Sequence, residues 1–236
     1  MTCSSLMTRP LYLQVRDALI ERIAAGAWKP GASIPNELDL SREYGVSAGT
    51  MRKALDIMES EHVVVRKQGR GTYVIDQATD ELLGRYTAVR HANGARVAGQ
   101  VEIVDVMEGV AHEQECERLR LELSDTVYRI RSVARVAGSP YMVEQISMPA
   151  RLFPDLLKTN GFPRDISAIA QAHGKLLGKP EERISVGQAS PEVAELLLVA
   201  PMAPLIVLDR VSISLDGNFV EWRVAQCHLT ANCYLA

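Results

Sequence analysis

The chain has 236 residues, of which 47% are hydrophobic and 23% are charged, and its formal net charge is −3. This composition is typical of a globular protein, and the length allows one large domain or two smaller ones. The sequence contains neither a run of eighteen apolar residues nor the apolar core of a signal peptide, so we expect a cytoplasmic protein with no membrane partner. Residues 1–75 hold 10 basic and 8 acidic residues, whereas the remainder holds 16 and 21, which mildly favours a polyanionic partner for the N-terminal part.

The first segment with helical periodicity is 11–25, where one face carries Leu11, Val15, Leu19 (or Ala18) and Ile23. Gly26 and the following Lys-Pro-Gly sequence predict the end of this helix and a turn. We interpret the helix as a scaffold element that contributes to the core.

Two shorter helices follow, joined by a tight turn at Gly45. The first is expected at 37–44, with Asn36 as its N-cap and with apolar contacts from Leu38, Leu40 and Tyr44. The second is expected at 47–61 behind the N-cap Ser47, and its core-facing stripe consists of Met51, Ala54, Leu55 and Met58. Such a pair predicts a helix-turn-helix, and the small and basic residues near the start of its second helix suit the major groove of DNA.

A β-hairpin is predicted after the second short helix, with strands at 63–65 and 72–75. Its tip carries Arg66, Lys67, Gln68 and Arg70, and glycines at 69 and 71 allow the backbone to approach a phosphate or enter a minor groove. An isolated hairpin of this composition is ordinary, but directly after a helix-turn-helix it predicts a wing.

Residues 10–75 resemble the winged helix-turn-helix of the GntR family of bacterial transcription regulators. The resemblance rests on motifs in matching order and spacing: Pro10-Leu11-Tyr12, Gly26-x-x-x-Pro30-Gly31, Ile34-Pro35-x-Glu37-x-x-Leu40, Gly45-Val46-Ser47, Thr50-x-Arg52-x-Ala54-Leu55 and Gln68-Gly69-x-Gly71-Thr72. It implies binding to double-stranded operator DNA through Ser47, Thr50, Arg52, Gln68 and Gly69. From charge and placement alone we add Lys53 and Arg70, and Gly49 is included because it lies on the same face near the start of the helix. Leu38 and Ala48 stand where the family has arginines, so we expect an unusual operator.

An acidic, polar segment at 76–81 is expected to link this unit, residues 9–75, to a second one at 82–236. There, alternation predicts a strand at 96–106 and two hairpins, one pairing 127–136 with 141–147 around Gly138-Ser139-Pro140, the other pairing 205–215 with 219–229 around Asp216-Gly217. Helices are predicted at 166–172 and at 191–198, the latter with Ser190 as N-cap and Pro191 at its first position. This mixture indicates an antiparallel α+β domain.

The second region resembles the UTRA effector-binding domain of the HutC subfamily, whose fold resembles chorismate lyase. The matching motifs are Val127-Tyr128-Arg129-Ile130-Arg131, Gly138-x-Pro140-x-x-x-Glu144, Pro149-x-x-x-Phe153-Pro154-x-Leu156, Ala203-Pro204-Leu205, Arg210 and Val220-Glu221. The resemblance implies a ligand-responsive transcription regulator. We expect a repressor that acts as a homodimer, because paired recognition helices read palindromic sites.

The effector-binding residues follow from the same resemblance. Glu144 and Ser167 match pocket residues, and Tyr86 and Thr87 fall near an aromatic–serine pair. The positions of an arginine pair found in sugar-phosphate-sensing relatives are occupied by Ser132 and Ala134, which favours a carboxylate or other small metabolite over a sugar phosphate. The last strand adds Glu221, Arg223 and His228. Three alternatives stay open: Glu221 and Arg223 as a cross-strand ion pair at the surface, His228 as a structural residue, and Glu144 without ligand contact.

Other functional classes are less well supported by the residues. Cys227-His228 with Cys233 does not complete a metal-ligand set, so we expect no metal and no cofactor. The alternative function is a lyase-like enzyme, or a small-molecule binding protein with a vestigial DNA-binding domain. The sequence shows no nucleophile elbow, phosphate loop or informative carboxylate pair, so we expect no enzymatic activity. A helical, metal-containing sensor domain, as in another GntR subclass, conflicts with the alternating hairpins.

Overall fold

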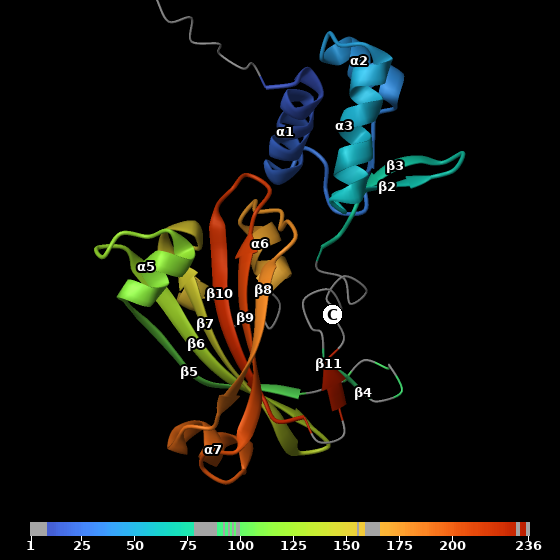
Figure 1. Ribbon diagram of the computed structural model, residues 1–236. Coiled ribbons are helices and arrows are strands. Elements are labelled where there is room, and N and C mark those ends of the chain that lie inside the picture. The colour runs from blue at the N-terminus through green and yellow to red at the C-terminus, as the bar shows by residue number, and fades with distance from the viewer. Residues whose placement is uncertain are drawn as a thin grey trace, which may run out of the picture. The chain divides into compact units, whose positions relative to one another are not determined.

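The computed structural model describes residues 9–77, 89–91, 93, 95, 97, 100–154, 156–158, 166–229 and 232–234, with the side chains of 91, 158, 166, 167 and 232–234 excepted. The chain divides into two compact units, one containing the residues up to Gln77 and the other almost all of the rest (Figure 1). Most of the expected linker at 76–81 lies outside the described residues, so the domain boundaries stay a prediction. Among the described helices, none is long and apolar enough to cross a membrane.

The first unit combines three helices with a small antiparallel sheet. The helices are α1 (Leu11–Ala24), α2 (Glu37–Glu43) and α3 (Ala48–Ser60). The strands β1 (Ser33–Ile34), β2 (Val64–Lys67) and β3 (Gly71–Val74) lie in the order β1-β3-β2. The predicted stripe of α3 is confirmed, because all four of its residues are buried: Met51, Ala54, Leu55 and Met58.

Both predicted N-caps are confirmed by hydrogen bonds. The Asn36 side chain accepts from the Asp39 amide at 2.9 Å, and Ser47 Oγ accepts from the Thr50 amide at 3.2 Å. Each bond satisfies an amide that the first helical turn leaves without a partner. Ser47 therefore fixes where α3 begins.

Two apolar contacts expected from the sequence are wrong. Leu11 is 52% exposed and Leu38 is 53% exposed, because the buried face of α1 is centred further along the helix and α2 turns its Leu40 side inward. The buried face of α1 includes Arg16, whose guanidinium donates to Glu61 at the end of α3 at 2.8 and 2.5 Å. The buried face that periodicity predicted to be apolar thus also contains a paired arginine.

The second unit is built on one antiparallel sheet of six strands in the order β5-β6-β7-β10-β9-β8. These strands are β5 (Gln100–Val110), β6 (Thr126–Val136), β7 (Ser139–Pro149), β8 (Glu181–Gln188), β9 (Pro204–Ile213) and β10 (Phe219–Cys227). A separate two-stranded sheet pairs β4 (Val89–His91) with β11 (Asn232–Tyr234). The remaining elements are α5 (Glu113–Leu119), α6 (Ile166–Ala172), α7 (Pro191–Leu197), η1 (Ala150–Leu152) and η2 (Leu156–Lys158).

Alternation along β6 divides the sheet into two faces with different coverings. Val127 packs with Leu119 of α5, and Val133 packs with residues of α7, so we call this side the α5/α7 face. Ile130 packs with Ile169 of α6 on the opposite side, the α6 face. Because side chains alternate along β6, each residue of this strand faces either α5 and α7 or α6.

Several boundaries differ from those expected. The strand expected at 96–106 is β5 at 100–110, and the first hairpin turns at Ala137 and Gly138, both with positive φ (48° and 82°), rather than at Gly138-Ser139-Pro140. A two-residue turn with two positive φ angles matches the twist of its strands, so β7 begins as early as Ser139. The elements α5 and β8 were not predicted, whereas α6 and α7 were.

Substituting Leu55 should lower the free energy of unfolding much more than substituting Leu38. Leu55→Ala removes a side chain that is 1% exposed and should lower the free energy of unfolding by about 2–5 kcal/mol. Leu38→Ala removes an exposed one and should change it by less than about 0.5 kcal/mol. Urea denaturation of the full chain measures both, and equal losses would contradict the assignment of the core face of α2.

Candidate functional site

The start of α3 presents a polar surface that its own capping arranges. Ser47 Oγ lies 2.9 Å from Thr50 Oγ1, and Gly49 is exposed beside them. One turn further, the Arg52 side chain is 66% exposed and its Nε donates to Glu37 Oε2 at 3.1 Å. These four predicted DNA-binding residues, Ser47, Gly49, Thr50 and Arg52, therefore share one exposed end of the helix.

Lys53 has a different environment from Arg52. Its ammonium lies 4.0 Å from the centre of the Tyr12 ring on α1, a cation–π contact that holds the charge on the α1 side of the helix. The DNA contact expected of Lys53 from charge and placement stays a prediction.

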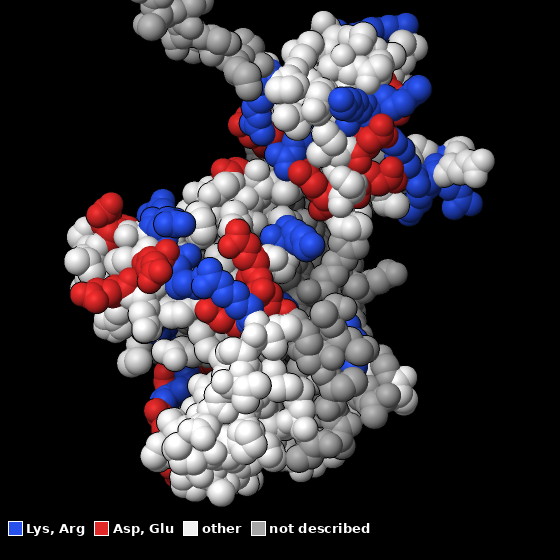
Figure 2. All heavy atoms as spheres, in the orientation of Figure 1, with Lys and Arg blue, Asp and Glu red and all other residues white. Residues whose placement is uncertain are grey.

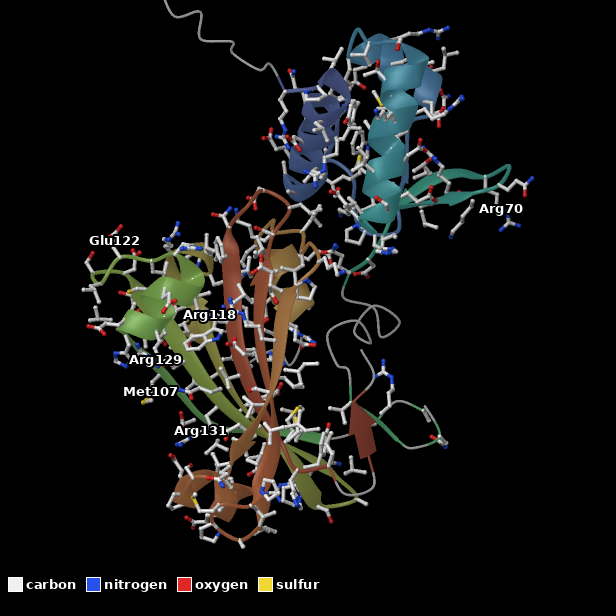
Figure 3. The ribbon with its side chains drawn as sticks, viewed as in Figure 1. Arg70, Met107, Arg118, Glu122, Arg129 and Arg131 are labelled. Carbon is white, nitrogen blue, oxygen red and sulfur yellow. The ribbon has the colours of Figure 1, made fainter. Side chains whose placement is uncertain are left out.

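The hairpin of β2 and β3 carries the other predicted contacts at its tip. Gln68, Gly69 and Arg70 lie between the two strands and are exposed, with Gly69 at a φ of 69°. Arg70 extends from this tip (Figure 3), and basic side chains gather along the hairpin (Figure 2). We call Ser47, Gly49, Thr50 and Arg52 together with Gln68, Gly69 and Arg70 the recognition surface.

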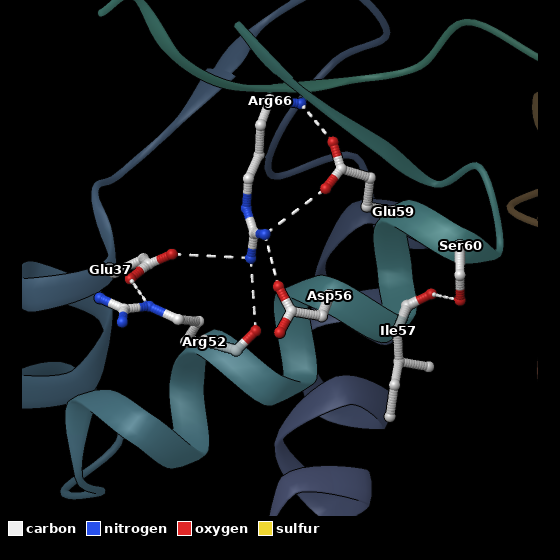
Figure 4. Close-up of polar contacts among 7 residues, drawn as sticks. All are labelled: Glu37, Arg52, Asp56, Ile57, Glu59, Ser60 and Arg66. Atoms are coloured by element: carbon white, nitrogen blue, oxygen red, sulfur yellow. Dashed lines mark hydrogen bonds and ion pairs between the residues drawn. The ribbon is translucent and has the colours of Figure 1, made fainter. Parts of the chain in front are cut away.

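Arg66 does not belong to the hairpin tip, which corrects the expectation from the sequence. Its guanidinium turns back onto α3, where Nη1 lies 2.5 Å from Asp56 and 3.4 Å from Glu59 and Nη2 donates to the Arg52 carbonyl at 3.3 Å (Figure 4). Three carboxylates within reach hold this cation at the base of the hairpin, because Glu37 also lies 3.6 Å away. Arg66 thereby fixes β2 against α3.

A second polar group lies on the α6 face of the six-stranded sheet. Arg223 Nη1 donates to Glu144 Oε1 at 2.7 Å and its Nε donates to Glu221 Oε1 at 2.6 Å. Ser132 Oγ donates to the other oxygen of Glu144 at 3.3 Å, and Ser212 Oγ donates to the other oxygen of Glu221 at 3.0 Å. We call these five residues the effector cluster. Strands β6, β7, β10 and β9 each supply at least one of them.

The effector cluster is buried, which contradicts the alternative of a surface ion pair between Glu221 and Arg223. Glu221 is 1% exposed, and the arginine bridges two carboxylates, one on its own strand and one on β7. Burial alone would lower the pKa of Arg223, but the charges of Glu144 and Glu221 outweigh it and raise that pKa above its ordinary value. The cluster thus keeps one permanent cation between two acceptors.

Three residues in or next to this cluster were not predicted as site residues. Ser212 belongs to it, and Arg210, also buried, donates to Glu182 of β8 at 2.7 Å. The signal was available in the hairpin around Asp216-Gly217, because counting back from the turn pairs Ser212 with Glu221 and Arg210 with Arg223. A polar residue opposite a predicted site residue in an antiparallel pair lies on the same face.

The other predicted effector-binding residues have mixed outcomes. Ala134 is buried in an apolar group with Met142, Leu208, Ala225 and Cys227, so it forms an apolar border to the polar residues. His228 follows β10, where its amide donates to the Tyr141 carbonyl at 2.9 Å. Tyr86, Thr87 and the side chain of Ser167 lie outside the described residues.

Comparisons with protein families identify both units. The model of the UTRA domain matches residues 95–231, which is more than half of the chain. The model described as bacterial regulatory proteins, gntR family, matches residues 11–74.

Within the described parts of the chain, no group of three or more His, Cys, Asp or Glu side chains could hold a metal ion.

Individual relatives agree with these matches. The mannosyl-D-glycerate transport/metabolism system repressor of Escherichia coli is 28% identical over 217 residues, covering 92% of this chain and 88% of that protein. The histidine utilization repressor of Pseudomonas putida is 26% identical, covering 85% and 81%. Among solved structures, the possible regulator YydK of Bacillus subtilis has a TM-score of 0.55 at 14% identity over 97% and 99% of the two chains. PhnF of Mycobacterium smegmatis has 0.54 at 21%, over 91% and 94%. These two structures support the fold alone.

Titration of Tyr141 should make the protein less stable in alkali. Burial and then the charge of Glu144 raise the pKa of Tyr141 from 10.0 to about 12. The folded chain therefore holds this proton more tightly than the unfolded chain, and the resulting stability is present below pH 10 and lost as the pH rises towards 12. The free energy of unfolding should fall more steeply over that window in the wild type than in Tyr141→Phe. Parallel curves from chemical denaturation would contradict this.

Proposed function

Because the chain belongs to the gntR family of bacterial regulatory proteins and carries a UTRA domain, we propose that it is a homodimeric repressor whose affinity for operator DNA is set by a small carboxylate or similar metabolite. Its general function is that of a DNA-binding transcription regulator with an effector-binding domain. The proposal concerns the contact residues, the assembly, the direction of regulation and the chemical class of the effector.

The single observation that carries the DNA-binding part is the arrangement of the recognition surface. The capped start of α3 exposes small side chains with one arginine, and the hairpin tip adds a second exposed arginine and a glycine. A helix of this kind enters the major groove, while a glycine-containing basic tip follows the phosphate backbone or minor groove. We assign base reading to Arg52 and Thr50, and backbone positioning to Ser47, Gln68, Gly69 and Arg70.

A homodimer is supported by the size of one recognition surface. One short helix reads only a few base pairs, whereas two copies about one helical turn apart read a palindromic site. The relatives described above are named as repressors, which supports the same direction of regulation here. A cytoplasmic location is part of the proposal, and operator DNA as the partner supports it.

The effector cluster supports a small polar ligand and disfavours a sugar phosphate. It contains two carboxylates and one arginine, and both carboxylates are already held by Arg223 and by serine hydroxyls. A phosphate dianion would meet more negative than positive charge, since a phosphate site needs several cationic or amide donors. A ligand with a single carboxylate or a hydroxyl can accept from Arg223 through that group, while other hydroxyl or amino groups of the same ligand donate to Glu144 or Glu221.

The same arrangement supports binding rather than catalysis. A general acid or base needs a proton that can move at the working pH, but Arg223 is a permanent cation and each glutamate oxygen in the described contacts faces an N–H or O–H donor. We therefore propose a sensor without enzymatic turnover. The effector lowers operator affinity if it prefers the arrangement that cannot bind DNA, and a coupling of ~1–3 kcal/mol gives a change of about 5–150-fold.

Arg52→Ala should lower affinity for the operator by about tenfold or more, because a bidentate arginine–guanine pair is worth ~1–3 kcal/mol of discrimination. The melting temperature should stay unchanged, since the side chain is exposed. Lys53→Ala is the matched control and should weaken specific and non-specific binding by equal factors. Fluorescence anisotropy with operator and random duplexes measures both. A large fall in melting temperature for Arg52→Ala would make that residue structural.

A thermal-shift screen of the full chain should identify carboxylates and not sugar phosphates as ligands. A ligand at 100 times its dissociation constant stabilises by ~2.7 kcal/mol, which raises the melting temperature by several degrees. Ser132→Ala should reduce the shift. Ser147→Ala is the matched control, because this buried hydroxyl donates to Glu115 on the α5/α7 face. A clear shift with a sugar phosphate would refute the proposed effector class.

A further inference from the structure

Glu37 lies between the arginine of the recognition surface and the arginine at the base of the hairpin. Its Oε2 accepts from Arg52 Nε at 3.1 Å, and its Oε1 lies 3.6 Å from Arg66 Nη2 (Figure 4). Glu37 is the first residue of α2, whereas Arg52 is on α3 and Arg66 is on β2. One carboxylate therefore connects all three elements that border the recognition surface.

The contact with Glu37 restricts how Arg52 can approach a base. An arginine has donors on Nε and on two Nη atoms in a rigid plane. Glu37 occupies Nε, and among residues 9–77 no further side-chain bond of Arg52 is seen, so the two Nη groups remain available. These two groups form the end of the fork that matches the O6 and N7 acceptors of guanine. The long side chain thus loses rotational freedom before it meets DNA.

Arg66 gives this arrangement a fixed base. It donates to the Arg52 backbone carbonyl at 3.3 Å and is paired with Asp56 and Glu59 on the next turns of α3. Its own amide donates to Glu59 at 3.0 Å. Glu37, which orients the Arg52 side chain, therefore also lies close to the Arg66 guanidinium, and that guanidinium is bonded to the Arg52 backbone.

We propose that Glu37 is a positioning residue for base recognition, which holds Arg52 so that its two Nη groups read one guanine per half-site. This inference rests on the proposed DNA-binding function. A negative charge near the phosphate backbone weakens binding to every sequence, so Glu37 is unfavourable for affinity in general. Its contribution is to the ratio between specific and non-specific binding, because fixing a flexible side chain in its bound geometry lowers the entropy cost of the contact.

The test compares base preferences of the full-length wild type and of variants. A pool of random DNA duplexes is enriched on the wild-type protein, and the base-pair profile of each half-site is then measured for Glu37→Gln, Glu37→Asp and Arg52→Ala. Both Glu37 variants should lose about tenfold or more of the preference at one base pair, and it should be the pair affected by Arg52→Ala. Glu37→Asp retains the charge but withdraws the carboxylate by one methylene, so its loss cannot come from net charge.

Asp39→Asn is the matched control, because this carboxylate is also on α2 and pairs with Arg42 and not with Arg52. It should strengthen binding to all duplexes by one common factor and leave the profile unchanged. In an Arg52→Ala background, Glu37→Gln should alter the profile no further, since the two residues act through one contact. A residue of merely structural importance would lower the melting temperature and weaken all sequences together.

Each outcome decides between the inference and its premise. A wild-type protein that enriches no sequence refutes the proposed function itself. A wild-type profile that both Glu37 variants reproduce refutes the inference and leaves the function standing. A preference lost equally with Asp39→Asn also refutes it, because the effect would then be one of general charge.

Discussion

Arginine–carboxylate pairs connect the elements of both units, and the recognition surface and the effector cluster depend on them. A buried charge is expensive unless hydrogen bonds and an opposite charge compensate it. Arg16 meets Glu61 between α1 and the end of α3, and Arg223 meets two glutamates on the sheet. Removing one member of such a pair leaves the other charge buried without a partner. These contacts therefore fix geometry more than they add net stability.

The two sites use the same interaction in opposite surroundings. Arg52 is largely exposed and is held by a single carboxylate, so water or DNA can compete for its remaining donors. Arg223 is enclosed, and its pairing with Glu144 and Glu221 is screened little by salt. Affinity for a polyanion should therefore respond strongly to ionic strength, whereas the ion pairs of Arg223 with Glu144 and Glu221 should not.

The sequence predicts most of the fold, because caps and periodicity are local signals. Ser47, Asn36 and the stripe of α3 are confirmed, as are the helices at 166 and 191. Local signals fail where tertiary contact decides. Leu38 is apolar yet exposed, and Arg66 is basic yet turned away from the hairpin tip. For the effector cluster, the sequence pointed to Ser132, Glu144, Glu221 and Arg223, whereas finding Ser212 needed the strand pairing around the Asp216-Gly217 turn as well.

The turn at Ala137 and Gly138 has a consequence for how this protein family can diversify. Together with an irregularity in the pairing between Ala134 and Arg135, it sets the register in which Ser132 opposes Glu144 and Ala134 opposes Met142. Inserting or deleting one residue there would exchange the two faces of β6, moving its arginines to the α6 face and Ser132 to the α5/α7 face. A point substitution keeps this register, although a change at Glu144, Glu221 or Arg223 also removes the partner of a buried charge. Hairpin length thus fixes which side chains of β6 lie on the α6 face, and replacing side chains on an unchanged frame alters the chemistry of that face.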